Sequence, residues 1–149
     1  MKLTTLVPAL QTAIGPVIVI SGVGLLILSM TNRLGRIIDR ARLLAEKRRN
    51  GLPDDVRRAA AQLTILSRRA KIVRNAIAFA SLCILFTSVL IITIFVMALA
   101  GSDGASVIAS LFIAAFVSLI ISLISFLRDI NISLTALDVE IDLPGSTKS

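Results

Sequence analysis

The residues that could do chemistry in this chain are few, and most of them are arginines. Arg33, Arg36 and Arg40 follow one another at spacings of three and four, which places them on one face of a helix. Lys71 and Arg74 lie in a second basic stretch. Basic clusters that lie next to a membrane attract the anionic headgroups of phospholipids. These five residues are therefore candidates for binding anionic phospholipids or other anions.

The amino-acid composition gives little indication of catalytic activity. The chain of 149 residues contains no His, Trp or Tyr, and its one cysteine, Cys83, lies in an apolar run. Without histidine, a serine nucleophile lacks its usual base and a zinc site lacks a common ligand. Asp39, three residues after Arg36, is expected to form a structural ion pair. We therefore expect no enzyme activity, no metal site and no cofactor.

A polar series of another kind occurs further along the chain, where small residues recur at intervals of four. Its members are Ser106, Ser110, Ala114, Ser118 and Ser122. Small residues let membrane helices approach closely, and hydroxyls add hydrogen bonds between them. Helix packing is the first interpretation of the four serines, and a hydrated pore is the alternative.

Three long uncharged stretches must hold these residues. They cover residues 3–32, 75–102 and 104–127, in a chain that is 56% hydrophobic with a mean hydropathy of +0.91. Each exceeds the roughly 20 residues that a helix needs to cross a bilayer. The sequence predicts an all-α integral membrane protein with three transmembrane helices. No Asp, Glu, Lys, Arg or His lies inside the stretches, which argues against proton-coupled transporters and voltage sensors.

The basic residues concentrate between the first two stretches. Residues 33–74 hold thirteen Lys and Arg but only four acidic residues. By the positive-inside rule this region is cytoplasmic, with the N-terminus outside and the C-terminus cytoplasmic in a bacterial inner membrane. The region contains no aromatic residue and no reader motif, so nucleic acid is not an expected partner.

Apolar residues continue beyond the uncharged stretches at alternating spacings of three and four. The first series is Met30, Leu34, Ile37, Ala41 and Leu44; the second is Val56, Ala59, Leu63, Leu66, Ala70, Val73 and Ile77; the third is Leu127, Ile130, Leu134, Leu137 and Ile141. This pattern is typical of helices packed along a seam. We expect a basic hairpin, onto which an acidic helix of residues 128–142 docks within one subunit or between subunits.

The expected organisation follows from these patterns. Residues 1–32 form an N-terminal segment and the first transmembrane helix, with a proline kink or a re-entrant half-helix near residues 15–16. Residues 33–75 form the cytoplasmic hairpin, 76–100 the second transmembrane helix, 101–105 an external turn and 106–127 the third transmembrane helix. Residues 128–142 form the acidic amphipathic helix and 143–149 a flexible tail.

Three stretches also resemble a known family. They are "ISGVGLLILSMTNRLGRIIDRAR" (20–42), "LSRRAKIVRNAIAFASLCILF" (66–86) and "SLISFLRDINISLTALDVEI" (122–141), and together they are similar to the small bacterial membrane proteins of domain of unknown function 2721. The resemblance implies a bacterial integral membrane protein and no particular activity. Asp129 matches a position where the resemblance implies an acidic residue, which favours a structural ion pair with the hairpin.

The function expected from the sequence is that of a non-enzymatic membrane protein acting through assembly. It would be a homo-oligomeric scaffold or an accessory subunit of a larger membrane complex. One alternative is a homo-oligomeric channel with a basic cytoplasmic mouth, which would favour anions. Another is a membrane organiser that binds anionic phospholipids.

Overall fold

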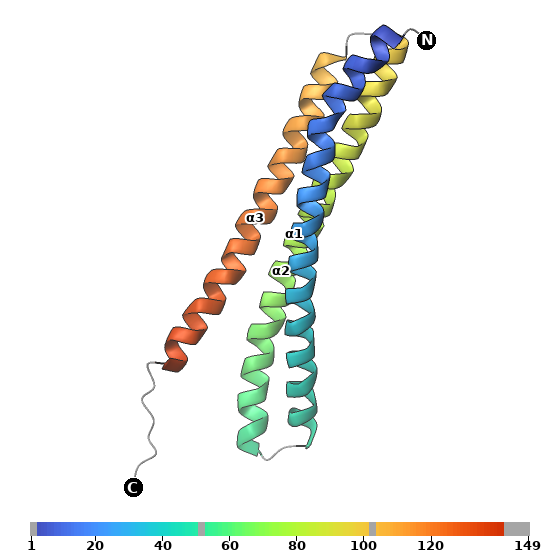
Figure 1. Ribbon diagram of the computed structural model, residues 1–149. Coiled ribbons are helices and arrows are strands. Elements are labelled where there is room, and N and C mark those ends of the chain that lie inside the picture. Colours follow the sequence, from blue (N-terminus) through green and yellow to red (C-terminus); the bar gives the residue numbers. More distant parts are fainter. Residues whose placement is uncertain (1–2, 51–52, 102–103, 142–149) are drawn as a thin grey trace.

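The protein consists of three long helices. The computed structural model describes residues 3–50, 53–101 and 104–141, and every regular element in these ranges is α-helical. The helices are α1 (Leu3–Asn50), α2 (Pro53–Ala100) and α3 (Ala105–Ile141), each running antiparallel to the one before it (Figure 1). All three are long and apolar enough to cross a membrane. The predicted class, an all-α protein with three membrane-type helices, is confirmed.

The change from apolar to basic sequence occurs inside single helices. α1 continues from the first uncharged stretch to Asn50 without a break, and α2 runs from Pro53 through the basic part into the second stretch. Pro8 and Pro16 both lie within α1, although proline cannot donate the backbone hydrogen bond of a helix. The structure thus has one continuous helix through both prolines and not a half-helix that ends near residues 15–16, while a proline kink within α1 stays a prediction.

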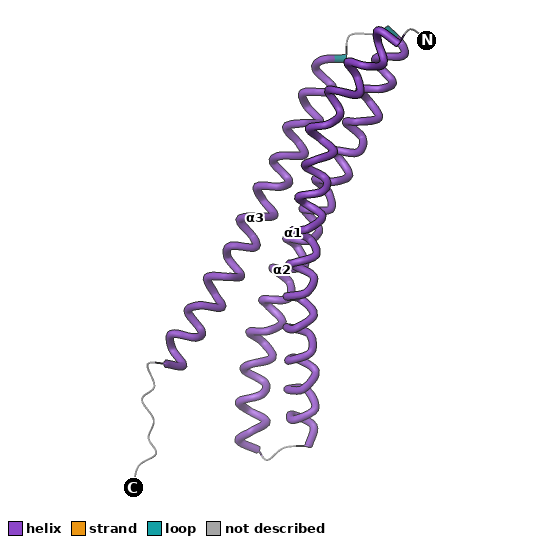
Figure 2. Tube along the Cα trace, in the orientation of Figure 1, coloured by secondary structure: helices purple, strands orange, loops and turns teal. Residues whose placement is uncertain are grey.

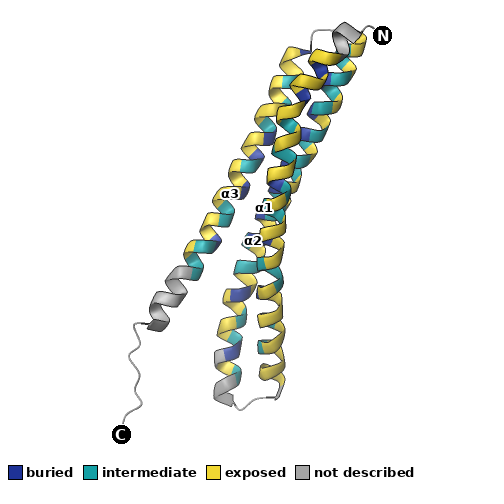
Figure 3. Ribbon diagram, in the orientation of Figure 1, coloured by how far each residue is buried: buried dark blue, intermediate teal, exposed yellow. Residues whose placement is uncertain are grey.

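The contact of α1 with α2 is lined by the apolar series expected from the sequence. Met30, Ile37, Leu66, Val73 and Ala76 form a buried cluster here. The partly buried side chains packed against it include Leu34, Ala41, Leu44, Ala70 and Ile77. Figure 3 shows the buried residues where the helices face one another and mostly exposed residues on the outer surfaces. Spacings of three and four therefore locate the seam of the α1–α2 hairpin.

Small residues bring the helices together nearer the other end. Ala80 and Cys83 on α2 form a buried cluster with Val23 on α1 and Ala115 on α3. α2 ends at Ala100, and the next residue, Gly101, has a φ of 64°, in the left-handed region that glycine adopts without strain. Gly104, just before α3, lies so close to the Met97 side chain that a Cβ atom there would clash with it. The start of α3 therefore lies against the last turns of α2.

The start of residues 128–142 contacts the hairpin of its own chain through Asp129 and Ser133. Beyond these residues α3 diverges from α1 and α2 towards its C-terminal end (Figures 1 and 2). A bundle that includes the rest of this segment, within one subunit or between subunits, therefore stays a prediction. Asp142 and the expected tail of residues 143–149 lie outside the described residues.

Candidate functional site

A buried carboxylate joins all three helices just beyond their uncharged stretches. Asp129 on α3 is completely buried, with an exposed fraction of 0%. Arg33 Nε on α1 lies 2.9 Å from its Oδ2 atom, and Arg69 Nε on α2 lies 3.1 Å from its Oδ1 atom. One side chain thus pairs with an arginine from each of the other two helices.

The hydroxyl of Ser133, one turn further along α3, completes this cluster. Its Oγ atom accepts a hydrogen bond from Arg33 Nη2 at 2.9 Å and another from Arg69 Nη2. The same hydroxyl donates to the backbone carbonyl of Asp129 at 3.0 Å. The Arg33 guanidinium also lies over the ring of Phe126, 5.7 Å from its centroid. We call Arg33, Arg69, Asp129 and Ser133 the polar clamp.

The polar clamp holds more positive than negative charge. A buried carboxylate is costly unless charges and hydrogen bonds compensate it, and two guanidinium groups do so here. Oδ2 accepts no well-aligned hydrogen bond from the described residues, so the nearby charge of Arg33 holds it. The arginine side chains are 25% and 18% exposed, so each keeps contact with its surroundings. The positive charge that Asp129 does not neutralise therefore remains accessible at the surface of the protein.

A pocket of about 400 Å³ opens beside the polar clamp. Four arginines line it, together with the apolar side chains of Ile37 and Leu66; they are Arg33, Arg36, Arg40 and Arg69. We call this the arginine pocket. Of the five residues predicted to bind anions, it brings together the three on α1. Lys71 and Arg74 are exposed on α2 and do not line it.

The other predicted site residues have different surroundings. Asp39 is exposed and forms no ion pair with any residue that the structure describes. Ser122 is fully buried, and its hydroxyl donates to the backbone carbonyl of Ala76 on α2 at 2.7 Å. Ser118 is also buried and donates within its own helix at 2.8 Å.

The first two serines of the series, Ser106 and Ser110, are exposed, and Ser110 donates to the carbonyl of Val107 in its own helix. Packing therefore describes the last two serines, whereas the first two lie outside the contact of α2 with α3. The pore interpretation stays open for an assembly of several chains.

Two residues of the polar clamp were missing from the candidates. Ser133 lies four residues after Asp129, so it shares a helical face with that carboxylate, and this spacing could have identified it. Arg33 and Arg69 are equally far from Gly51 along the chain, so the antiparallel arrangement of α1 and α2 brings them to the same level of the hairpin. The helical seam alone does not distinguish Arg69 from its neighbour Arg68.

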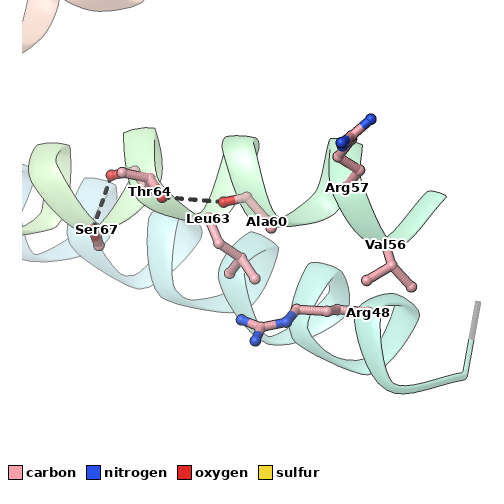
Figure 4. A pocket seen from close by; sticks show the side chains of 7 residues that line it. All are labelled: Arg48, Val56, Arg57, Ala60, Leu63, Thr64 and Ser67. Atoms are coloured by element: carbon pink, nitrogen blue, oxygen red, sulfur yellow. Dashed lines mark hydrogen bonds between the residues drawn. The ribbon is translucent and has the colours of Figure 1, made fainter. Parts of the chain in front are cut away.

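A larger hollow near the hairpin turn offers less chemistry. It has a volume of about 660 Å³ and is lined by Arg48, Val56, Arg57, Ala60, Leu63, Thr64 and Ser67. In Figure 4, Leu63 points from α2 towards α1 while Arg57 points away from it. The hydroxyls of Thr64 and Ser67 donate to carbonyl groups of their own helix. The arginine pocket is therefore the better candidate site.

Comparison with known proteins gives a family but no function. No curated protein and no solved structure matches the chain. A family model described as "Protein of unknown function (DUF2721)" matches residues 13–139, which include most of each helix and the whole polar clamp. The resemblance noted in the sequence is thereby confirmed, and the chain belongs to the DUF2721 family.

Proposed function

We propose that this protein is a non-enzymatic membrane scaffold that assembles with further copies of itself through its basic hairpin. The basic hairpin comprises residues 33–50 of α1 and 53–75 of α2. The observation that carries the proposal is an apolar groove on this hairpin, from which α3 of the same chain diverges. A larger membrane complex could use the same surface.

The groove lies in the charged part of the chain, outside the uncharged stretches, where we expect water to surround it. It has a volume of about 350 Å³ and is lined mainly by aliphatic side chains; its residues are Ile37, Ile38, Ala41, Arg42, Ala45, Leu63, Leu66, Ser67 and Ala70. Leu43 and Ile65 on the same hairpin are 63% and 55% exposed. Exposed apolar surface of this kind favours contact with a partner.

The partner that fits this groove is the C-terminal part of α3 from a second copy. Residues 134–142, which follow the polar clamp, carry three acidic residues and no basic one, opposite in sign to the basic hairpin; the acidic residues are Asp138, Glu140 and Asp142. Leu134, Leu137 and Ile141 repeat at the spacing of a seam helix. A third helix from a neighbouring chain would cover the groove and neutralise part of the hairpin's charge. Exchange of this segment would link the copies.

Disulfide crosslinking tests this exchange. One copy carries Ala41→Cys, a second copy with a different tag carries Leu137→Cys, and both carry Cys83→Ala. We expect oxidation in membranes to give a disulfide-linked species that contains both tags, because Ala41 lines the groove. Gel electrophoresis with detection of each tag measures the product.

The matched control replaces Ala41→Cys by Asp39→Cys. Asp39 is two residues from Ala41, so it lies at nearly the same position along the axis of α1 but on the opposite face of the helix. Its crosslinking should therefore be much weaker. Equal crosslinking at both positions, or none at Ala41, contradicts the proposal. So does a crosslink that forms only when Ala41→Cys and Leu137→Cys are in the same chain.

We further propose that the protein lies in the inner membrane of bacteria with the basic hairpin in the cytoplasm. The excess of Lys and Arg in residues 33–74 supports this orientation. By contrast, the turn between α2 and α3 holds a single charged residue, Asp103. The turn should therefore lie outside the cytoplasm.

Labelling with a membrane-impermeant maleimide checks the orientation. In a Cys83→Ala background, we expect Ala105→Cys to react in intact bacterial spheroplasts. Ala61→Cys, exposed on the hairpin, should react only after the membrane is opened. The reverse pattern contradicts the orientation, and labelling of both positions in opened membranes shows that both cysteines are accessible.

A further inference from the structure

We propose that the arginine pocket binds a phosphate-bearing anion, with Arg36 and Arg40 as its free binding groups and Arg33 and Arg69 as groups shared with the polar clamp. The four side chains come from two helices and line one hollow of about 400 Å³. None of the residues that line it is acidic. The pocket lies within one chain, so it does not depend on the self-assembly proposed above.

The charges around the pocket are not balanced. Asp129 is the one described carboxylate that pairs with any of its four guanidinium groups. Arg36 and Arg40 are exposed and form no ion pair with another described residue. Like charges three or four residues apart destabilise a helix slightly, and a bound anion would reverse this effect. The arrangement favours an anionic ligand.

The polar clamp positions two of the four binding groups. Asp129 binds the Nε atoms of Arg33 and Arg69, and Ser133 accepts from one Nη atom of each. Each guanidinium has five N–H donors, so both arginines keep donors that the clamp does not use. Fixed guanidinium planes match the oxygen geometry of phosphate well. The buried carboxylate thus keeps two arginines ordered at the wall of the pocket.

The arginine pocket lies next to the uncharged stretches, where the headgroup of a membrane lipid would lie. Arg33 is the first charged residue after the uncharged stretch of α1, and its guanidinium lies over Phe126 at the end of the stretch in α3. Ile37 and Leu66 give the pocket an apolar part that can contact the glycerol or upper acyl region. A free phosphate ion shares the same charge and oxygens, so the two sources must be separated by experiment.

Thermal protection of Cys83 measures binding in the purified full chain. Cys83 is the only cysteine and is buried between the helices, so its reaction with a fluorogenic maleimide reports unfolding. The protein in neutral detergent is titrated with phosphatidylglycerol, with inorganic phosphate and with zwitterionic phosphatidylcholine. We expect phosphatidylglycerol to raise the temperature of Cys83 exposure and phosphatidylcholine to have little effect.

Two double variants with the same charge change test the location. Arg36→Gln/Arg40→Gln removes two groups that line the pocket, and we expect its apparent Kd for phosphatidylglycerol to rise about 30-fold, or about fivefold for each arginine. Arg49→Gln/Arg68→Gln removes two exposed arginines outside the pocket and should bind almost as the wild type does. The single variant Arg40→Gln is measured beside them, so the comparison stands if the double variant folds poorly.

The outcomes distinguish the ligands. Protection by phosphatidylglycerol alone identifies a lipid headgroup as the ligand, and protection by inorganic phosphate, with or without the lipid, includes the free ion. Both results support the site. Protection by neither, equal protection by phosphatidylcholine, or equal loss of binding in the two double variants would overturn it, since the last result indicates diffuse charge attraction.

Discussion

Replacing Asp129 by asparagine is expected to destabilise the assembly of the three helices by about 3 kcal/mol. The substitution keeps the size of the side chain but removes the one negative charge between Arg33 and Arg69. The two guanidinium groups then repel each other across the contact of α1 with α2, and α3 loses its ion pairs to both. Because both arginines are partly exposed, they can regain some hydration, which keeps the loss at the lower end for a broken buried pair.

Two measurements follow this loss in purified protein. The temperature at which Cys83 becomes reactive should fall by several degrees, because separation of the helices exposes it. Hydrogen exchange should quicken in the part of α3 after Phe126, because the polar clamp holds that segment against α1 and α2. Exchange in the middle of α2 should change less, since apolar packing stabilises it.

Asp39→Asn is the matched control for Asp129→Asn. It makes the same chemical change on an exposed residue without an ion pair to any other described residue, so both measurements should stay as in the wild type. If Asp129→Asn behaves like Asp39→Asn, the polar clamp does not stabilise the fold. A further variant, Asp129→Glu, keeps the charge but is longer, and it should fall between the wild type and Asp129→Asn.

The sequence predicts the helices well because their signals are local. Long uncharged stretches give the three membrane-type helices, and spacings of three and four give the residues that line the contact of α1 with α2. Pro16 did not change the predicted ends of α1, but it left open whether the helix is continuous. A proline inside a helix is tolerated where other contacts compensate for the missing backbone hydrogen bond. Local sequence patterns therefore do not decide whether α1 is continuous.

The polar clamp was harder to predict because it depends on the relative heights of three helices. Arg33 and Asp129 are far apart in the sequence, and a shift of one helical turn would separate their side chains. The antiparallel hairpin aligns Arg33 with Arg69, but no local pattern in the sequence of α3 indicates that Asp129 lies level with them. Their position just before the second uncharged stretch favoured Lys71 and Arg74 as binding residues, whereas neither lines the arginine pocket.

Replacing Ala80 by leucine is expected to destabilise the protein by roughly 1 to 3 kcal/mol, through packing within the membrane-type part of the helices. Ala80 is completely buried on α2, in a cluster with Val23 of α1 and Ala115 of α3. Small residues at such a point let three backbones approach, and contact between close helices drives their association in lipid. A leucine there must push the helices apart.

Ala78→Leu is the matched control for Ala80→Leu. Ala78 lies on the same helix but is exposed, so the same added volume meets lipid or detergent instead of another helix. Ala80→Leu should lower the temperature of Cys83 exposure and of helix loss by circular dichroism, whereas Ala78→Leu should leave both unchanged. Equal behaviour of the two variants means that the contact of the three helices at Ala80 does not hold the structure together.

Ala80→Leu and Asp129→Asn also separate the two sources of cohesion. The cluster at Ala80 acts inside the uncharged stretches, while the polar clamp acts just beyond them. The two sites share no side chain, so their effects should add in the double variant. An effect of the double variant that is much smaller than the sum means that loss of one contact already releases α3. In that case the cluster at Ala80 and the polar clamp act as one cooperative unit that holds α3 against α1 and α2.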